Sequence, residues 1–196
     1  FQVLCAGGDT WLGGDDFDLA LANHFADLFW KQTSVDLRNR AVEWQALIFA
    51  CEKAKRDLSN KNAAEVHVEN LLHTAGGTRG LHTKISRKDF VKLTAELVTK
   101  SLTVVEKVLL QAGVAAKQVD TVVMTGGTSF IPSVRDAVAD YFGKRPVLSD
   151  PNLAVVKGAA LRAGEPTGEG ADAAGGRKLR EVCGRGDPFG GYGGDE

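Results

Sequence analysis

The 196-residue sequence lacks the features that mark membrane and nucleic-acid-binding proteins. No apolar run approaches the roughly 18 residues of a membrane-spanning helix, and no signal-peptide pattern opens the chain. Lys and Arg (24) nearly balance Asp and Glu (25), so no strongly basic surface is expected. We therefore expect neither a membrane nor a nucleic acid as a partner.

Cysteine and histidine are also sparse, and their spacing excludes the common metal motifs. There are three cysteines, an odd number, and they form no CxxC pair; the four histidines form no HExxH motif. These residues are Cys5, Cys51, Cys183, His24, His67, His73 and His82. The pattern predicts reduced thiols in a cytoplasmic protein and no metal site built on His or Cys.

What is present is ordinary globular material, 43% hydrophobic and 25% charged, enough for one or two compact domains. The chain opens on a strand-like run, Phe1–Cys5, without Met, as if it were entered partway through a fold. Apolar periodicity continues to Ala163. Residues 165–196 hold ten of the 23 glycines without such periodicity, so we expect a glycine-rich disordered tail there.

Hydrophobic spacing and turn residues predict an alternation of helices and strands. Helices are expected at 15–31, 39–59, from the Ser86–Asp89 cap to Gly113, at 131–142 and at 151–163; strands are expected at 64–68, 81–85, 120–125 and 146–148. The two strands at 64–68 and 81–85 should form an antiparallel hairpin. The apolar strand at 120–125 is of the kind that is buried on both faces. This order is typical of an α/β protein.

The most informative segment is Gly8–Asp18, which reads GDTWLGGDDFD. Gly13 and Gly14 allow a sharp turn and a close approach of the backbone to a bulky partner. Asp15 and Asp16 then fall in the first turn of the predicted helix, where carboxylates suit unpaired N–H groups. A glycine turn at a helix start is a typical place for an anionic or nucleotide ligand.

A second candidate group lies on the predicted helix at 39–59. Glu52, Lys55, Arg56 and Ser59 are spaced i, i+3, i+4, i+7 and share one face. Together they offer an acceptor, two cations and a hydroxyl, which suit a ribose and a purine. The alternative is a solvated face in which Glu52 pairs with Arg56. Because both cations would be exposed on either interpretation, we expect removal of Lys55 or Arg56 to change stability by less than about 1 kcal/mol.

The third candidate group is the glycine loop Thr125–Pro132, which reads TGGTSFIP. It joins the apolar strand at 120–125 to a helix whose first turn contains Pro132. A pair of glycines is common in tight turns and is weak support for a ligand site. Its position at the carboxyl end of a strand makes a nucleotide loop as plausible as a simple turn.

Together these groups resemble one family, the heat shock protein 70 (DnaK-type) chaperones. Gly8–Asp18 resembles its Gly-Asp-Thr-x-Leu-Gly-Gly-x-Asp-Phe-Asp signature, and Cys51–Ser59 resembles its adenosine-binding helix. Val123–Pro132 resembles its Gly-Gly-Ser-Thr-Arg-Ile-Pro loop, and Asp150–Ala160 its Asn-Pro-Asp-Glu-Ala-Val-Ala-x-Gly-Ala-Ala segment. The likeness runs from residue 1 to about 163, in the family's order and spacing.

The resemblance implies the second lobe of an actin-like (ribonuclease H-like) ATPase domain with an inserted α+β subdomain. Residues 1–164 would form this lobe. Residues 1–14 and 88–164 would make its base subdomain, and residues 15–87 its upper subdomain. In the family, the nucleotide lies in a cleft between two lobes.

The resemblance also implies a nucleotide site for ATP or ADP. Glu52, Lys55, Arg56 and Ser59 would hold ribose and adenine, and Gly126, Gly127 and Thr128 would close on base and phosphates. Gly14 would allow close backbone approach. Phe130 stands where the family has the Arg that packs on adenine, and Asn152 stands where it has Asp. An aromatic ring can still stack on a purine.

The family's first lobe, with its phosphate loop and magnesium-organising carboxylates, finds no match in this sequence, nor does its peptide-binding domain. Phosphoryl transfer depends on positioning around Mg²⁺ and the phosphates, so this chain alone is not expected to hydrolyse ATP. Family partners would be a nucleotide-exchange factor or a J-domain co-chaperone. The alternative function is an interaction module that docks such partners and no longer binds nucleotide.

Overall fold

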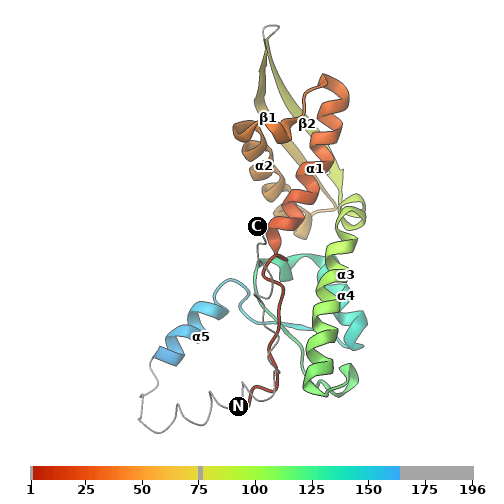
Figure 1. Cartoon of the computed structure of the whole chain (residues 1–196), viewed down its shortest axis with the longest axis vertical. Helices are drawn as coiled ribbons and strands as arrows, with labels where there is room; N and C mark the ends of the chain where they lie inside the picture. The colour runs from red at the N-terminus through yellow and green to blue at the C-terminus, as the bar shows by residue number, and fades with distance from the viewer. Residues whose placement is uncertain (1, 75–76, 164–196) are drawn as a thin grey trace, which may run out of the picture.

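The structure is a computed structural model, and it describes residues 2–74 and 77–163. The molecule is elongated, with its first two helices and a β-ribbon in the upper part and the Gly126–Ile131 turn in the lower part (Figure 1). One long helix, α3 (Arg87–Ala112), runs from the upper part down along the lower part (Figure 1). The expected tail at 165–196 lies outside the described residues.

Two helices pack on the ribbon in the upper part. Helix α1 spans Gly14–Thr33 and helix α2 spans Ala41–Asn60, with a short 3₁₀ turn, η1 (Leu37–Asn39), between them. Strand β1 (Ala63–Thr74) pairs antiparallel with β2 (Gly77–Ser86), and Ala64 lies opposite Ile85. The helix and hairpin predictions for this region are confirmed, and the strands are longer than expected.

The main hydrophobic core lies where α1, α2 and the ribbon meet. In α1 the apolar residues recur at about every fourth position, so they lie on one buried face, as in an amphipathic helix. The fully or almost fully buried side chains include Phe17, Leu21, Phe25 and Phe29 of α1, Leu47, Cys51, Ala54 and Leu58 of α2, and Ala64, Val66, Leu72, Leu81 and Ile85 of the ribbon. This core fixes α2 against α1, and so fixes the face of α2 that bears the second candidate group.

Helix α3 begins and ends as its sequence predicts. The backbone N–H of Asp89 donates to Ser86 Oγ at 3.1 Å, and that hydroxyl donates to Asp89 Oδ2 at 2.6 Å. At the other end Gly113 adopts the left-handed conformation, φ 66°, which closes the helix. Ser86 and Gly113 therefore set the length of the helix that joins the two parts.

The lower part contains short elements. A 3₁₀ turn, η2 (Ala116–Gln118), precedes β3 (Val123–Met124), which pairs in parallel with β4 (Val147–Leu148). Between them come the 3₁₀ turn η3 (Gly127–Phe130) and helix α4 (Pro132–Phe142), and α5 (Ala154–Ala163) follows β4. The strand–glycine loop–helix order is confirmed, with α5 beginning three residues after the expected position.

Two expectations about strands are wrong. The apolar segment 120–125 is not buried on both faces: only Val123–Met124 form a strand, and Val123 is 59% exposed. Among the described residues β3 pairs with β4 alone, so its other edge is open. The run that begins at Phe1 carries no strand in its described residues, and Val3 and Leu4 are exposed. An extended segment forms a strand only when a neighbouring strand pairs with it.

Candidate functional site

The glycine turn before α1 forms the first wall of the candidate site. The backbone N–H of Gly13 donates to Asp16 Oδ2 at 2.7 Å, so Asp16 caps the first turn of the helix as expected. A Cβ placed on Gly14 would lie 3.4 Å from Lys55 Nζ and 3.6 Å from Thr128 Oγ1. Gly14 is therefore where α1, α2 and the lower turn approach one another.

The second wall is the face of α2 that bears the predicted group. Arg56 Nη2 lies 2.6 Å from Glu52 Oε1, and 77% of the Arg56 side chain is exposed. The Ser59 hydroxyl donates to the Lys55 carbonyl at 3.4 Å. The i,i+4 pairing of Glu52 with Arg56 is thus formed, as the solvated-face alternative expects, but this pairing leaves both residues at the surface of the hollow described below.

Lys55 differs from its neighbours, because its ammonium turns toward α1. Lys55 Nζ donates to Asp18 Oδ2 at 2.5 Å and to the Gly14 carbonyl at 2.9 Å. Only 14% of the Lys55 side chain and 5% of the Asp18 side chain are exposed. The expectation that both cations are exposed charges is therefore wrong for Lys55. The sequence does not show what faces that residue across the helix pair.

Burial dominates the electrostatics of this pair. Desolvation raises the pKa of the Asp18 carboxyl above 3.8, although the hydrogen bond from Lys55 works in the opposite direction. The other carboxylate oxygen of Asp18, Oδ1, is buried without a hydrogen-bond partner among the described residues. Asp18 is the last residue of the Gly8–Asp18 motif, whose spacing does not reveal its contact with Lys55.

The third wall is the turn Gly126–Ile131 of the lower part. Gly126 has φ 86°, a left-handed conformation that favours glycine. Its carbonyl accepts from the buried Ser129 hydroxyl at 2.6 Å, which tightens the turn. Its N–H donates to the Pro151 carbonyl at 2.8 Å, and this bond holds the Pro151–Asn152 segment beside the turn.

These walls enclose one cavity of about 720 Å³. Nine of the ten residues predicted from sequence line it, although they come from four separate segments. They are Gly14, Glu52, Lys55, Arg56, Ser59, Gly127, Thr128, Phe130 and Asn152. Gly126 does not line the cavity and instead shapes the turn. Asn60 and Ile131 also line it and were missed, and each directly follows a predicted residue in the sequence.

The cavity offers chemistry for a polar, ring-containing ligand. Glu52 supplies an acceptor, and Lys55 and Arg56 supply cationic donors. Phe130, 39% exposed, and Ile131 supply apolar surface on the opposite side. A volume of this size is within the usual range for small-molecule sites, which are mostly apolar with a few placed polar groups.

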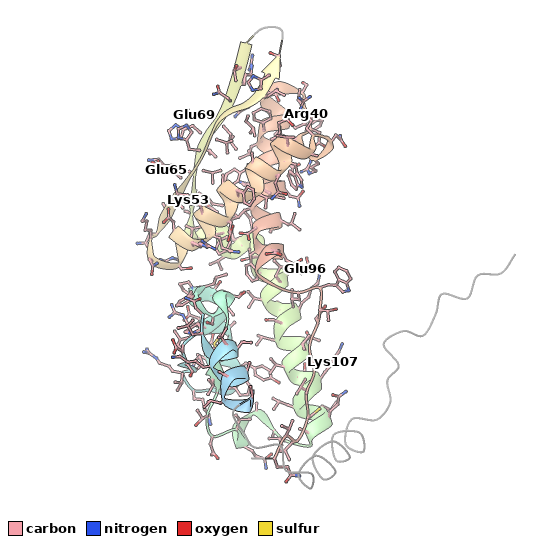
Figure 2. All side chains as sticks on the ribbon, turned by 90° about the vertical axis from the view of Figure 1, so that its left-hand side faces the viewer. Arg40, Lys53, Glu65, Glu69, Glu96 and Lys107 are labelled. Carbon is pink, nitrogen blue, oxygen red and sulfur yellow. The ribbon has the colours of Figure 1, made fainter. Side chains whose placement is uncertain are left out.

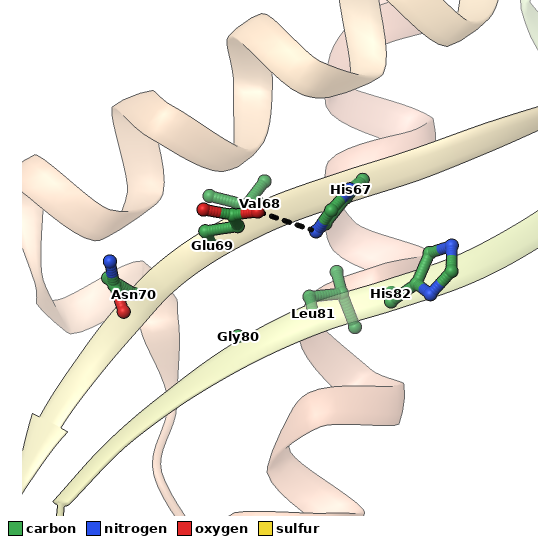
Figure 3. A pocket seen from close by; sticks show the side chains of 7 residues that line it. All are labelled: His67, Val68, Glu69, Asn70, Gly80, Leu81 and His82. Atoms are coloured by element: carbon green, nitrogen blue, oxygen red, sulfur yellow. Dashed lines mark ion pairs between the residues drawn. The ribbon is translucent and has the colours of Figure 1, made fainter.

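A second hollow, of about 320 Å³, lies on the outer face of the ribbon (Figure 3). It forms where the register shifts between Val68 and Leu72. His67 and His82 lie opposite each other there, with ring centroids 4.8 Å apart. Within residues 2–74 and 77–163, no group of three or more His, Cys, Asp or Glu side chains is placed to hold a metal ion. Within this hollow His67 Nε2 lies 3.8 Å from Glu69 Oε1 (Figure 3).

A sequence model of the family described as "Hsp70 protein" matches residues 1–175 of this chain. The chain belongs to the Hsp70 family. Hsp70 proteins are chaperones that bind adenine nucleotides, and the match covers the part of the chain that contains the cavity. Their nucleotide-binding region has the actin-like ATPase fold, with which the mixed α/β arrangement seen here is consistent. In the described residues no helix is long and apolar enough to cross a membrane.

Two positions at which this sequence departs from the Hsp70 motifs it resembles, Phe130 and Asn152, line the cavity. Phe130 occupies the place of the family's Arg at the end of the 3₁₀ turn, and Asn152 occupies the place of its Asp after Pro151. The planar face of Phe130 replaces that of a guanidinium group.

Proposed function

We propose that this chain is the adenine-side lobe of an Hsp70 chaperone ATPase domain and that its cavity binds the adenosine half of ATP or ADP. The observation that carries the proposal is the convergence of nine predicted residues, from four segments, on one cavity. Random surface residues of these types would not gather at one hollow. On this proposal residues 1–14 and 88–164 form the base subdomain and residues 15–87 the upper one.

The roles follow from the chemistry of each wall. The α2 face presents Glu52, Lys55 and Arg56, which suit the hydroxyls of a ribose and the edge of a purine. Phe130 is proposed to stack on the base. Gly127 and Thr128 present backbone and hydroxyl groups from below, and Gly14 keeps the space between α1 and the turn free of a side chain.

The lining residues suit the nucleoside part of a nucleotide better than its Mg²⁺-bound triphosphate. Among the described residues Glu52 is the single carboxylate that lines the cavity, and Asn152 provides a neutral amide. Hard divalent cations such as Mg²⁺ are held mainly by carboxylates and phosphate oxygens. We therefore propose that this chain contributes base and ribose contacts, with the phosphates and Mg²⁺ bound elsewhere in a full ATPase domain.

Isothermal titration calorimetry with adenosine tests this function. Wild-type protein should bind adenosine, and Arg56→Ala should weaken binding about tenfold, the usual loss for one charge-assisted hydrogen bond. Lys53→Ala is the matched control. Lys53 lies on the same helix but outside the cavity, on the outer side where Figure 2 shows Glu65 of β1. Equal affinity for all three proteins would contradict the assignment.

The second candidate is the interaction module, and the neutral residues Phe130 and Asn152 at the cavity favour it. On that account adenosine does not bind, and the chain docks a nucleotide-exchange factor or a J-domain co-chaperone. We place the protein in the cytoplasm as part of a stress response, on the basis of the family and the widely spaced cysteines. Calorimetry without any adenosine signal would favour this candidate.

A further inference from the structure

Asp18 and Gly14 form a clamp for the Lys55 ammonium beneath the cavity. They are four residues apart on α1, so they lie one helical turn apart on the same face. Lys55 Nζ reaches both, at 2.5 Å from Asp18 Oδ2 and 2.9 Å from the Gly14 carbonyl. The lysine therefore bridges from α2 to the first turn of α1.

The clamp contains a buried carboxyl group. Asp18 is 4% exposed, and one of its carboxylate oxygens has no hydrogen-bond partner among the described residues. A buried ion pair adds little to stability compared with apolar residues of similar volume. Burial raises the pKa of this carboxyl, because desolvation disfavours its charged form. Such groups are concentrated at functional sites.

The clamp determines which part of Lys55 faces the cavity. An ammonium has three N–H donors, and Asp18 and Gly14 accept two of them. Lys55 also lines the cavity, so the third donor is left for a ligand. A lysine side chain is otherwise flexible, because a four-carbon stem carries its charge. Fixing the ammonium before a ligand arrives lowers the entropy lost on binding.

We propose that Asp18 is a positioning residue, which holds Lys55 so that its remaining N–H donates to a ribose hydroxyl of the bound nucleoside. This inference rests on the proposed function, because it takes adenosine as the occupant. Asp18 itself does not line the cavity and acts through Lys55 alone. Its removal should therefore matter only while Lys55 is present and only for ligands that carry ribose hydroxyls.

A double-mutant cycle in binding affinity tests this dependence. Asp18→Asn should weaken adenosine binding about tenfold, and Lys55→Met should weaken it at least as much. Adding Asp18→Asn to Lys55→Met should cause no further loss of adenosine affinity. Neither single variant should alter the affinity for 2′,3′-dideoxyadenosine, which lacks the ribose hydroxyls. An equal loss from Asp18→Asn in both backgrounds, or for both ligands, would show a general structural effect and overturn the proposal.

A second measurement reports on the clamp without any ligand. Acetylation of lysines by an amine-reactive reagent, followed by mass spectrometry, should be slow at Lys55 and fast at the exposed Lys53 of the same helix. In Asp18→Asn the rate at Lys55 should rise at least tenfold while that at Lys53 stays constant. An unchanged rate at Lys55 would overturn the proposal. If circular dichroism shows that Asp18→Asn is unfolded, Asp18→Glu, which displaces the carboxylate by one methylene, replaces it with the same expected pattern.

The two measurements separate this inference from the function on which it rests. If wild type binds no adenosine but labelling still differs between Asp18→Asn and wild type, the proposed function fails and a ribose is not the acceptor. If adenosine binds and Asp18→Asn changes neither affinity nor labelling, the function stands and the positioning role fails.

Discussion

A Cβ on Gly14 would lie 3.6 Å from the Thr128 hydroxyl, so the start of α1 and the turn of the lower part are in near contact at the cavity. The same Cβ would lie 3.4 Å from Lys55 Nζ. Both separations are ordinary van der Waals contacts, so a methyl group fits there without displacing the backbone. It would, however, occupy the space between two lining residues.

Gly14→Ala should therefore weaken adenosine binding without unfolding the protein. Alanine in the first turn of a helix is at least as favourable as glycine, so the free energy of unfolding should be unchanged or up to about 1 kcal/mol higher. The affinity for adenosine should fall several-fold. Gly13→Ala is the control, because Gly13 does not line the cavity and has open space around its Cβ position. Equal affinities in calorimetry for both variants and wild type would argue against close approach at Gly14.

Lys55→Met should destabilise the fold, in contrast to the same substitution at Lys53, the other lysine of α2. It leaves the Asp18 carboxylate buried without its cation, which is expected to lower the free energy of unfolding by about 3 kcal/mol. Lys53→Met, at an exposed position of the same helix, should change it by less than about 0.5 kcal/mol. Urea denaturation measures both. A loss below 1 kcal/mol for Lys55→Met would mean that the pair is solvated in solution.

Asp18 should also give stability a characteristic pH dependence. Its folded pKa is raised above 3.8, mainly by burial, so the folded state binds a proton more readily than the unfolded state. The stability that this provides is fully present below pH 3.8 and is lost as the pH rises through the folded pKa. The free energy of unfolding of wild type relative to Asp18→Asn should therefore decrease from pH 3.5 to pH 7.

Urea titrations of both proteins across this range measure that difference. Exposed carboxylates such as Asp27, whose pKa is lowered mainly by its hydrogen bond with Arg38, have the opposite dependence, but they are present in both proteins and cancel. A difference that rises with pH would mean that the attraction of Lys55 outweighs desolvation at Asp18.

Phe130 should contribute to adenosine binding through stacking. Phe130→Ala is expected to weaken binding about tenfold, within the range measured for loss of an aromatic–base contact. Phe130→Arg, which restores the family's residue, should keep or improve the affinity. Phe49→Ala is the control, because Phe49 is an exposed aromatic on α2 that lies outside the cavity. Saturation-transfer NMR with adenosine compares these variants, and no loss in Phe130→Ala would exclude stacking.

The helices and the hairpin could be predicted from sequence because each depends on local spacing, whereas the membership of the cavity, which joins four separate segments, came from the resemblance to the Hsp70 motifs. Period 3.6 in α1 places Phe17 and Phe25 in the core, and the i, i+3, i+4, i+7 pattern places Glu52 and Ser59 on one face. The Ser86 cap and the Gly113 end are set by single residues. The faces and ends of these helices depend only on residues that are close together in the sequence.

The errors concern features that depend on partners distant in the chain. The apolar run at 120–125 suggests a buried strand, but its burial depends on which strands flank it. Within the described part of the chain only β4 pairs with β3, and Val123 is 59% exposed. The spacing of Lys55 identifies its helix face but not the residue opposite, and Asp18 is 37 positions away in sequence. Gly126 was expected at the ligand surface, whereas its left-handed backbone serves the turn.

An adenosine titration followed in ¹H–¹⁵N correlation spectra tests the central claim most directly. If the cavity is the adenosine site, the amide signals of Gly14, Ser59 and Gly127 should shift together with one dissociation constant, while those of His67 and His82 on the outer ribbon stay fixed. Shifts confined to the ribbon, or no shift at millimolar adenosine, would contradict the assignment and leave the interaction module as the function of this chain.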